Sequence, residues 1–343
     1  MLTNKLYALL LLLLFHSVSW GDEIDFNNIK VHGLYLSKGQ QSDHTYRVLR
    51  DKQDFLWIAS DYGLKRYNGY ELTVFTHDVD NEKSIAYDSI SELIYQDQQL
   101  WIGGNEISLY NPEYENFTNY NVSDHFAIYT MIKQGNLIWF GGEGYGLRAF
   151  DIESEKVVYQ YLDSPEHKFV YKIIADNQDN KFWVATNSGI SLVDADSGQK
   201  IEHLKINGIA SGETTLYDLV LDDNNRLWIA TSKGLISYNT ILKTQQIYTH
   251  QEDNPQSISE NVVTSLFIDK YQRLWVGTDK KGLNIYSPII DGFQQISSTI
   301  DTADTHHLPS MPINDIFQDK YQSYWIAGSQ GVYRISPHLE RFD

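Results

Sequence analysis

Short stretches of alternating apolar and polar residues, separated by polar turns, repeat along almost the whole chain. The clearest copy, residues 263–286, begins with an apolar, β-branched run and continues through a polar turn that opens at Asp269. Trp275 then begins a second apolar stretch, Gly282 ends a second turn, and alternation resumes. An Asp side chain accepts a backbone hydrogen bond from two residues on, and Gly adopts the positive φ that tight turns need. The pattern therefore predicts three antiparallel strands joined by two turns.

Seven of the eight tryptophans mark successive copies of this pattern. Their spacing is 44, 38, 44, 45, 47 and 50 residues, which is typical of four-stranded propeller blades. A fourth strand with a looser signature follows, as in 117–120 and 293–296. We therefore predict an all-β fold, a seven-bladed β-propeller of four-stranded blades over residues 22–343, with the repeated tryptophan packed between neighbouring blades. These tryptophans are Trp57, Trp101, Trp139, Trp183, Trp228, Trp275 and Trp325.

The two ends of the predicted propeller complement each other. Phe26–Ile29 matches the fourth-strand signature but precedes the first copy, whereas the seventh copy has only Phe342–Asp343 of such a strand. Pairing of the N-terminal strand with the last blade would close the ring and remove an exposed edge. The alternative is that a longer chain was cut inside that strand, and the sequence leaves both interpretations open.

The second copy departs most from the pattern. It lacks a turn-opening Asp in register, and Glu106 and Ile107 stand where the glycine is expected. We therefore expect its turns to differ from those of the other copies.

An apolar N-terminal segment precedes the repeats. Lys5 is followed by an unbroken apolar run, residues 6–15, and then by small residues up to Gly21. This order is typical of a secretory signal peptide, so we assign residues 1–21 to one, with cleavage after Gly21 or Ser19. Ten apolar residues are too few to span a bilayer, which takes about 20. We therefore expect a periplasmic mature chain that does not insert into the membrane.

Composition excludes several classes of function. The chain has no cysteine, which rules out a disulfide framework, a thiolate metal site and a thiol nucleophile. Its 27 Lys and Arg against 45 Asp and Glu give a formal net charge of −18. Because phosphate binding needs clustered cations, nucleic acids and anionic membrane surfaces are disfavoured as partners.

No catalytic motif is present in the sequence, which has no G-x-S-x-G elbow, H-E-x-x-H or P-loop. The glycine cluster at 141–146 lies in a predicted turn that opens a strand, so it lacks the helix dipole that holds phosphate. The Asp-rich turns at 176–180 and 222–225 lack the Gly and distant Glu of an EF-hand, and turn preference explains them. We therefore expect no enzyme activity, no cofactor and no metal.

Seven of the ten histidines of the mature chain fall in predicted linkers between blades. About one His per blade around a ring separates these side chains widely. We interpret them as solvated loop residues rather than as a metal-binding or pH-sensing cluster. They are His44, His77, His125, His167, His250, His306 and His307.

In a propeller, the turns between strands two and three share one face with the inter-blade linkers. Unlike the strands, these turns differ strongly between copies, and variation on a repetitive scaffold is what an asymmetric binding site requires. The alternative is that turn positions vary because nothing constrains them. We predict that the residues ringing this funnel and binding a ligand are Asp61, Tyr62, Asn105, Glu106, Glu143, Tyr145, Asn187, Lys233, Lys280, Lys281 and Gln330.

The turn-opening Asp, the Leu-Trp-Ile-Gly-Thr-like strand and the closing Gly-Leu-x-x-Tyr together resemble the two-component regulator propeller repeat. The resemblance covers residues 24–343, and the similar linkers 76–85 and 249–258 strengthen it. It implies the periplasmic ligand-sensing region of a bacterial regulator, usually followed by more blades, a β-sandwich, a membrane helix and a histidine kinase or diguanylate cyclase. The sequence contains none of these further parts, so we interpret it as a truncated relative or a stand-alone binding protein.

Three functional hypotheses follow. The first is a periplasmic sensor propeller whose funnel binds a polar extracellular small molecule, with a carbohydrate suggested by the mixture of Tyr, Asn and carboxylates. The second is a stand-alone protein-interaction propeller, which an apolar surface patch without a deep funnel would favour. The third is a propeller enzyme of the lyase or lactonase type, which convergent metal ligands or paired carboxylates in the funnel would favour.

Overall fold

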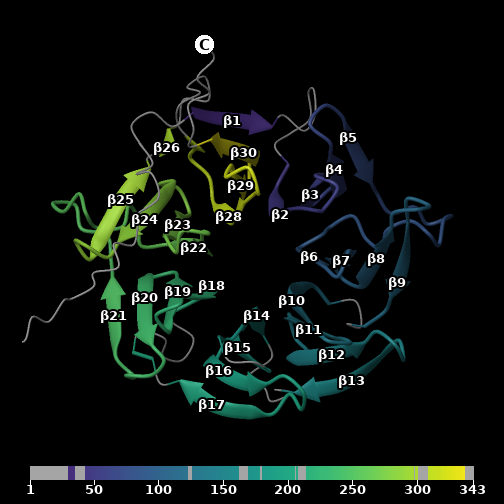
Figure 1. Ribbon diagram of the computed structural model, residues 1–343, viewed down its shortest axis with the longest axis horizontal. Coiled ribbons are helices and arrows are strands. Elements are labelled where there is room, and N and C mark those ends of the chain that lie inside the picture. Colours follow the sequence, from purple (N-terminus) through teal and green to yellow (C-terminus); the bar gives the residue numbers. More distant parts are fainter. Residues whose placement is uncertain are drawn as a thin grey trace, which may run out of the picture.

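Seven four-stranded antiparallel sheets form a ring around a central axis (Figure 1). The predicted all-β, seven-bladed propeller is therefore confirmed. None of the residues that the structure covers forms a helix long and apolar enough to cross a membrane. The predicted signal peptide, residues 1–21, lies outside the described residues. This computed structural model describes residues 30–34, 43–122, 126–161, 169–177, 180–204, 206–207, 214–296, 298–299 and 308–336.

Each blade contributes four strands, which run in order from the axis to the rim. The first strands, next to the axis, are β2 (Thr45–Arg50), β6 (Glu92–Gln96), β10 (Ile128–Gln134), β14 (Val170–Ala175), β18 (Leu216–Leu221), β22 (Val263–Ile268) and β28 (Ile313–Gln318). The second strands are β3 (Leu56–Ser60), β7 (Gln99–Gly103), β11 (Leu137–Gly142), β15 (Lys181–Thr186), β19 (Arg226–Thr231), β23 (Leu274–Thr278) and β29 (Tyr324–Gly328). The third strands are β4 (Gly63–Tyr67), β8 (Ile107–Asn111), β12 (Leu147–Asp151), β16 (Gly189–Asp194), β20 (Gly234–Asn239), β24 (Leu283–Ser287) and β30 (Gly331–Ser336). The outermost strands are β5 (Leu72–Phe75), β9 (Asn116–Tyr120), β13 (Lys156–Tyr161), β17 (Lys200–Leu204), β21 (Gln245–Tyr248), β25 (Gly292–Ile296) and β1 (Lys30–Leu34), and a parallel pair, β26 (Ser298–Thr299) and β27 (Leu308–Pro309), adds a small separate sheet.

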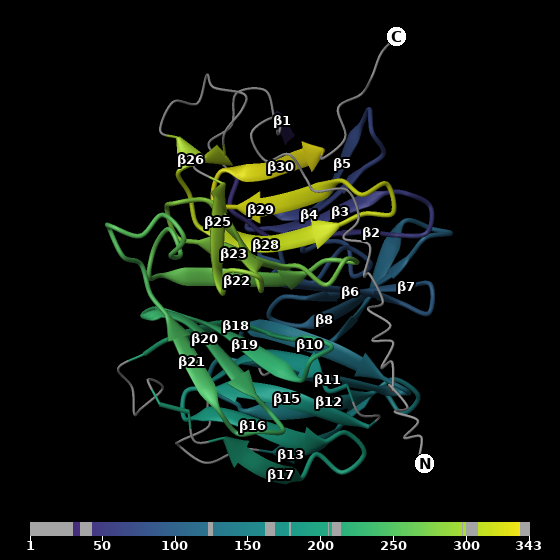
Figure 2. The ribbon, with the colours of Figure 1, turned by 60° about the vertical axis from the view of Figure 1, so that its left-hand side comes forward.

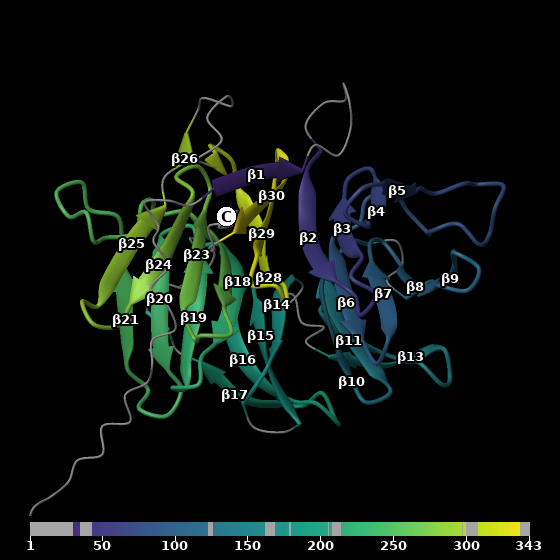
Figure 3. The same ribbon diagram turned by 45° about the horizontal axis from the view of Figure 1, so that its top comes forward.

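The N-terminal strand closes the ring. β1 pairs antiparallel with β30, with Val31 opposite Ile335, so the seventh blade combines both ends of the described chain (Figure 3). In Figure 2, β30, β29 and β28 lie one after another in this blade. Closure by an N-terminal strand was predicted, but the strand in the structure is Lys30–Leu34, directly after the predicted Phe26–Ile29, which lies outside the described residues.

An aspartate organises the turn between the first and second strands in five blades. In blade six, one oxygen of Asp269 accepts hydrogen bonds from the backbone N–H groups of Tyr271 (2.8 Å) and Arg273 (3.0 Å). The other oxygen accepts a bond from the indole Nε1 of Trp275 (3.0 Å). The sequence predicted the local turn, and the indole bond additionally fastens it to the core. The equivalent indole-to-carboxylate bonds are Trp57–Asp51 (2.7 Å), Trp183–Asp176 (2.6 Å), Trp228–Asp222 (3.1 Å) and Trp325–Asp319 (2.9 Å).

Blade two lacks this arrangement, in line with the expectation that its turns differ. β6 and β7 are joined through Asp97 and Gln98, whose φ angles are 52° and 64°. Positive φ at both central residues is the signature of a type I′ hairpin turn, which leaves no room for the longer aspartate turn. Within the described part of the chain, the buried indole nitrogen of Trp101 has no hydrogen-bond partner.

The hydrophobic core is divided among the gaps between adjacent blades. Trp275 of blade six lies against Tyr324 of blade seven, with ring centroids 4.1 Å apart. Trp57 contacts Tyr110 of blade two edge-on, with ring centroids 4.9 Å apart. Both tryptophans are fully buried, and each removes about 150–250 Å² from water. The predicted packing of the repeated tryptophan between neighbouring blades is therefore confirmed.

Candidate functional site

One end of each first strand aims a side chain at the axis. In β2, Thr45 pairs with Ser60 and Arg47 pairs with Ala59, so Tyr46 is an extra, unpaired residue. Five further first strands show the same register shift. Such a β-bulge redirects the side chain of the extra residue. We call this set, with its equivalent in blade two, the funnel ring: Tyr46, Ser91, Tyr129, Tyr171, Tyr217, Thr264 and Asn314, all of which line one cavity.

The central cavity has a volume of about 520 Å³. Small-molecule sites are commonly hollows of about 300–1,000 Å³. Residues of the inter-blade linkers, among them Ser89, Ala127 and Pro312, also line it. The cavity therefore lies on the face where the sequence placed the site.

The funnel ring is chemically uneven. Tyr129, Tyr171 and Tyr217 come from the adjacent blades three, four and five and form an aromatic arc, and Tyr46 adds a fourth phenol from blade one. Ser, Thr and Asn occupy the remaining three places of the ring. A tyrosine offers an apolar face for stacking and a hydroxyl for hydrogen bonding, so the ring suits a ligand with both kinds of surface.

Two of the four tyrosines are held by carboxylates. The hydroxyl of Tyr46 donates to Asp61 Oδ1 at 2.9 Å, and that of Tyr129 donates to Glu143 Oε2 at 3.3 Å. Burial, followed by the bond to Asp61, raises the pKa of Tyr46 to about 12. Burial and Glu143 likewise raise the pKa of Tyr129. Both phenols therefore stay protonated at neutral pH, with each proton directed at a carboxylate and the oxygen lone pairs left for a ligand.

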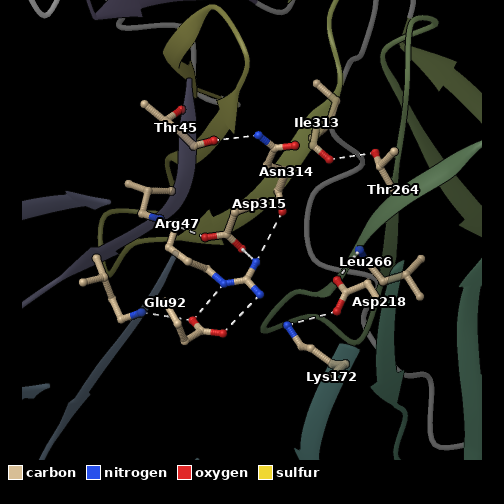
Figure 4. Close-up of polar contacts among 12 residues, drawn as sticks. Thr45, Arg47, Glu92, Lys172, Asp218, Thr264, Leu266, Ile313, Asn314 and Asp315 are labelled. Atoms are coloured by element: carbon tan, nitrogen blue, oxygen red, sulfur yellow. Dashed lines mark hydrogen bonds and ion pairs between the residues drawn. The ribbon is translucent and has the colours of Figure 1, made fainter. Parts of the chain in front are cut away.

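One residue further along the first strands, charged side chains cross between blades (Figure 4). Arg47 Nε and Nη2 donate to the two oxygens of Glu92 at 2.8 and 3.2 Å, and Nη1 lies 3.6 Å from Asp315 Oδ1. Burial raises the pKa of Asp315, and Arg47 opposes this effect. Opposite them, Lys172 Nζ lies 3.0 Å from Asp218 Oδ1, and Asp218 Oδ2 accepts the backbone N–H of Leu266.

These contacts belong to a closed circuit that joins every first strand to the next. Blade one meets blade two through Arg47 and Glu92, and blade four meets blade five through Lys172 and Asp218. Such fully paired polar networks stabilise a single arrangement of the strands. The remaining steps are Ser91 to Ile128, Ile173 to Thr130 (3.0 Å), Leu266 to Asp218 (2.9 Å), Thr264 to Ile313 (2.7 Å) and Asn314 to Thr45 (2.7 Å).

The predicted site residues lie mostly on the rim of the funnel rather than inside it. Of the eleven, Asn105 lines the cavity, and Asp61 and Glu143 reach it through the hydroxyls of Tyr46 and Tyr129. The second and third strands that carry these turns lie one or two strands away from the axis, so the turn tips stand back from the cavity. Those placed outside its lining are Tyr62, Glu106, Asn187, Lys233, Lys280, Lys281 and Gln330.

Tyr145 does not stand on the rim, contrary to the prediction. It is 3% exposed and packs between Phe126, Phe140 and Arg148. Its hydroxyl donates to the backbone oxygen of Ala127 at 3.2 Å. Because Gly144 and Gly146 both take positive φ, the turn folds this side chain back into the gap between blades.

The tyrosines of the funnel ring were missed by the sequence reasoning. Each ring position lies ten to twelve residues before the tryptophan of its blade, so the available signal was a variable residue at that offset. The bulge places this residue out of phase with the alternation that identified the strands. A pattern of period two therefore assigned it to the strand and not to the site.

The described residues contain no group of three or more potential metal ligands. Of the seven linker histidines, His77 and His250 occupy equivalent places, and the Nδ1 of each hydrogen-bonds a backbone oxygen, that of Ile85 (3.0 Å) and Ile258 (2.9 Å). These two histidines therefore fasten their linkers. Outside the described residues lie His125, His167, His306 and His307.

Residues 257–280, in blade six, match the family model described as "Two component regulator propeller". The resemblance inferred from the repeats is thereby confirmed for this copy. No curated protein is significantly similar to the chain in sequence.

Solved structures share the fold over almost all of the chain. One is the extracellular domain of a protein described as the hybrid two component system BT3049 from B. thetaiotaomicron, with 21% identity and a TM-score of 0.72 over 90% of this chain and 42% of that one. Another is the extracellular domain of BT4673 from the same organism, with 23% identity and a TM-score of 0.69 over 89% and 39%. The chain therefore spans about two fifths of each of these relatives.

An enzyme with the same fold is also similar. It is a catalytically inactive variant of virginiamycin B lyase from Staphylococcus aureus with quinupristin, with 15% identity and a TM-score of 0.68 over 90% of this chain and 99% of that one. At such low identities these likenesses establish a shared propeller fold and no more.

Proposed function

We propose that this chain is a ligand-sensing propeller of an exported bacterial signalling protein, and that its funnel binds a polar extracellular small molecule of the carbohydrate class. The observation that carries the proposal is the funnel ring. Seven equivalent positions of a repetitive scaffold hold four tyrosines, a Ser, a Thr and an Asn around a cavity of about 520 Å³. A structural role would favour the same residue in every blade, whereas recognition of an asymmetric ligand favours different ones.

The chemistry of the ring supports binding rather than bond breaking. The aromatic arc offers flat apolar faces for the C–H side of a sugar ring, and the hydroxyls and amide around it offer hydrogen bonds to sugar hydroxyls. The charged groups that the first strands place next to the ring are paired with one another, as Arg47 is with Glu92. They therefore support the cavity instead of presenting a free acid or base to a ligand.

The direct test is binding of the purified chain to an array of immobilised neutral, acidic and amino oligosaccharides. We expect the double variant Tyr171→Ala/Tyr217→Ala to weaken the wild-type signal about tenfold or more, because both rings belong to the aromatic arc that lines the cavity. Tyr70→Ala is the matched control, since this tyrosine is 95% exposed on the outer turn between β4 and β5. Unchanged binding by the double variant would show that the funnel is not the site.

Export to the periplasm is part of the proposal. The similarity to extracellular domains of two-component systems and the apolar N-terminal segment support it. N-terminal sequencing of the protein recovered from a periplasmic extract should begin at Asp22 or Trp20, after cleavage at Gly21 or Ser19. Recovery of an intact N-terminus from the cytoplasmic fraction would contradict it.

A protein-docking role is the second candidate, because apolar side chains cluster on neighbouring outer turns. Ile241 and Leu242 of blade five are 67% and 71% exposed, and Ile289 and Ile290 of blade six are 78% and 47% exposed. Exposed apolar patches mark protein interaction sites. Replacing Ile241 and Ile289 with Ser should leave oligosaccharide binding unchanged, and loss of a co-purifying protein from the double variant would favour this role.

A further inference from the structure

We propose that the funnel selects protonated amino sugars over neutral and acidic ones. This inference deepens the function proposed above and rests on it. It starts from the balance of hydrogen-bond donors and charges that the cavity presents.

The two carboxylate-held tyrosines make the cavity rich in acceptors. The hydroxyls of Tyr46 and Tyr129 donate their protons to the carboxylates of Asp61 and Glu143. A ligand in the cavity therefore contacts phenol oxygens that can only accept, and each has a negative charge directly behind it. A hydrogen bond to such an oxygen is strengthened when the donor is a cation. An ammonium group therefore gains more here than a hydroxyl, and a carboxylate finds no donor at these two places.

The charged side chains that line the cavity reinforce this preference. They are Arg47 and Asp279. The Arg47 guanidinium is already neutralised by both oxygens of Glu92, so it offers little to an anionic ligand. Asp279 faces the cavity with its Oδ2 3.3 Å from the Nζ of Lys280, a side chain that is 68% exposed. Pairing at such an exposed cation is weak and compensates little of the carboxylate charge.

The aromatic arc and the charge of the whole chain act in the same direction. The faces of tyrosine rings attract ammonium groups, and three such rings line the cavity from the adjacent blades three, four and five. The formal net charge of −18 raises the local concentration of cations and lowers that of anions. The combination of flat apolar faces, acceptors and negative potential fits a sugar ring that carries a protonated amine.

The experiment compares three trisaccharides by titration calorimetry at pH 6, where alkyl amines are protonated. They are the glucosamine trimer, its fully N-acetylated form and the galacturonic acid trimer. We expect the glucosamine trimer to bind at least about tenfold more tightly than either of the others, a difference of about 1.4 kcal/mol. Equal or tighter binding of the acetylated or acidic trimer would overturn the inference.

Two variants test where in the protein the preference for the protonated amine arises. Asp61→Asn should reduce the ratio between the affinities for the glucosamine trimer and the N-acetylated trimer about threefold to tenfold, because it removes the charge behind Tyr46. Asp97→Asn is the control: it removes the same charge from an exposed turn at the other end of the propeller, so the preference should persist. Equal effects of both substitutions would assign the preference to overall charge and overturn the inference.

Tyr171→Ala separates this inference from the proposed function. If it weakens binding of all three trimers while the amine brings no advantage, the funnel is a sugar site without the proposed selectivity. If the glucosamine trimer binds but Tyr171→Ala has no effect, the cation adheres elsewhere on the acidic surface, and both proposals fail.

Discussion

At one end of the innermost strands five of the seven blades repeat a single arrangement, whereas at the other end the side chain differs between blades. Where the first strand enters the next turn, five blades place an aspartate under the indole of their tryptophan, as Asp269 lies under Trp275. At the funnel, the ring position is Tyr in four blades and Ser, Thr or Asn in the others.

The difference follows from what each end contacts. We call the five aspartates that accept an indole bond the clamp aspartates: Asp51, Asp176, Asp222, Asp269 and Asp319. They meet the same packing requirement in each of these blades, next to a tryptophan in the gap between blades, and Asp269 is only 1% exposed there. The tyrosines of the funnel ring face an open cavity, as Tyr217, 40% exposed, shows. The Ser, Thr and Asn of the ring also bond to backbone oxygens of neighbouring blades. Repetition therefore marks positions that hold the propeller together, and under the proposed function the varying ring positions serve recognition.

The largest expected effect on the free energy of unfolding comes from removing one clamp aspartate. Asp269 accepts bonds from two backbone N–H groups, from Trp275, from Arg273 Nε and from the hydroxyl of Tyr324. Asp269→Ala leaves these donors buried and unpaired, so we expect the free energy of unfolding to fall by about 3–5 kcal/mol. Urea unfolding followed by tryptophan fluorescence measures the loss.

Asp97→Ala is the matched control for that variant. Asp97 occupies the corresponding turn of blade two, but its side chain is 64% exposed and pairs with Lys133. Its removal should cost no more than about 1 kcal/mol. A similar loss in both variants would mean that the bonds of Asp269 contribute no more to stability than the exposed ion pair of Asp97 does.

The hydrogen bonding of the indole nitrogens differs between blades, and this difference can be tested. Trp→Phe keeps most of the apolar surface but removes the N–H group, which is bonded in Trp275 and lacks a partner among the described residues in Trp101. Losing a bond to a charged acceptor costs about 1.5–3 kcal/mol. We therefore expect Trp275→Phe to destabilise the protein by about 2 kcal/mol more than Trp101→Phe does in the same urea experiment. Equal losses would show that the clamp bond contributes nothing beyond apolar burial.

A substitution at the funnel end of the first strands should lower the free energy of unfolding by less, and the loss should depend on pH. Burial and Asp61 raise the pKa of Tyr46 to about 12, above the unfolded value of about 10, so the folded state favours the protonated phenol. The stabilisation is complete below pH 10 and is lost as the pH rises from 10 to 12. Tyr46→Phe should cost about 1 kcal/mol at pH 8.

Thermal unfolding of the wild type and of Tyr46→Phe at pH 8, 10 and 11 tests this expectation. Tyrosines common to both proteins contribute equally, so the gap between the two midpoints isolates Tyr46. The gap should narrow above pH 10. A gap that stays constant would mean that Asp61 does not hold the phenol in its protonated form.

Much of the fold follows from the sequence because the interblade contact is the same each time. The spacing of Trp57, Trp101 and the later tryptophans indicates the number of blades, since each must fill one gap between sheets. The Asp that opens the turn is recognisable from local preference. Its second bond, to the indole, depends on two strands lying side by side, which local preference does not reveal.

The site follows less completely from the sequence because it depends on distance from the axis. Variation between copies indicated the face on which the cavity lies, but it pointed to the turns that carry Lys281 and Gln330 rather than to the first strands that line the cavity. Tyr171 and Tyr217 reach the cavity through a single extra residue in each strand. A shift of one residue reverses the side of a strand that a side chain occupies, and period-two patterns do not register it.

The smallest expected effects concern the turn tips, and they decide between the rim and the ring as the site. Lys281 is exposed and Gln330 Nε2 donates to Ser310 O at 2.9 Å on the surface, so Lys281→Ala and Gln330→Ala should each change stability by less than about 0.5 kcal/mol. Because neither residue lines the cavity, both variants should bind the glucosamine trimer as the wild type does in calorimetry. Asn105→Ala, a change of similar size inside the cavity lining, should weaken that binding. If Lys281→Ala or Gln330→Ala weakened binding as strongly as Asn105→Ala, the ligand would have to extend over the rim. The turns between the second and third strands would then belong to the binding site, as their variation between copies first suggested.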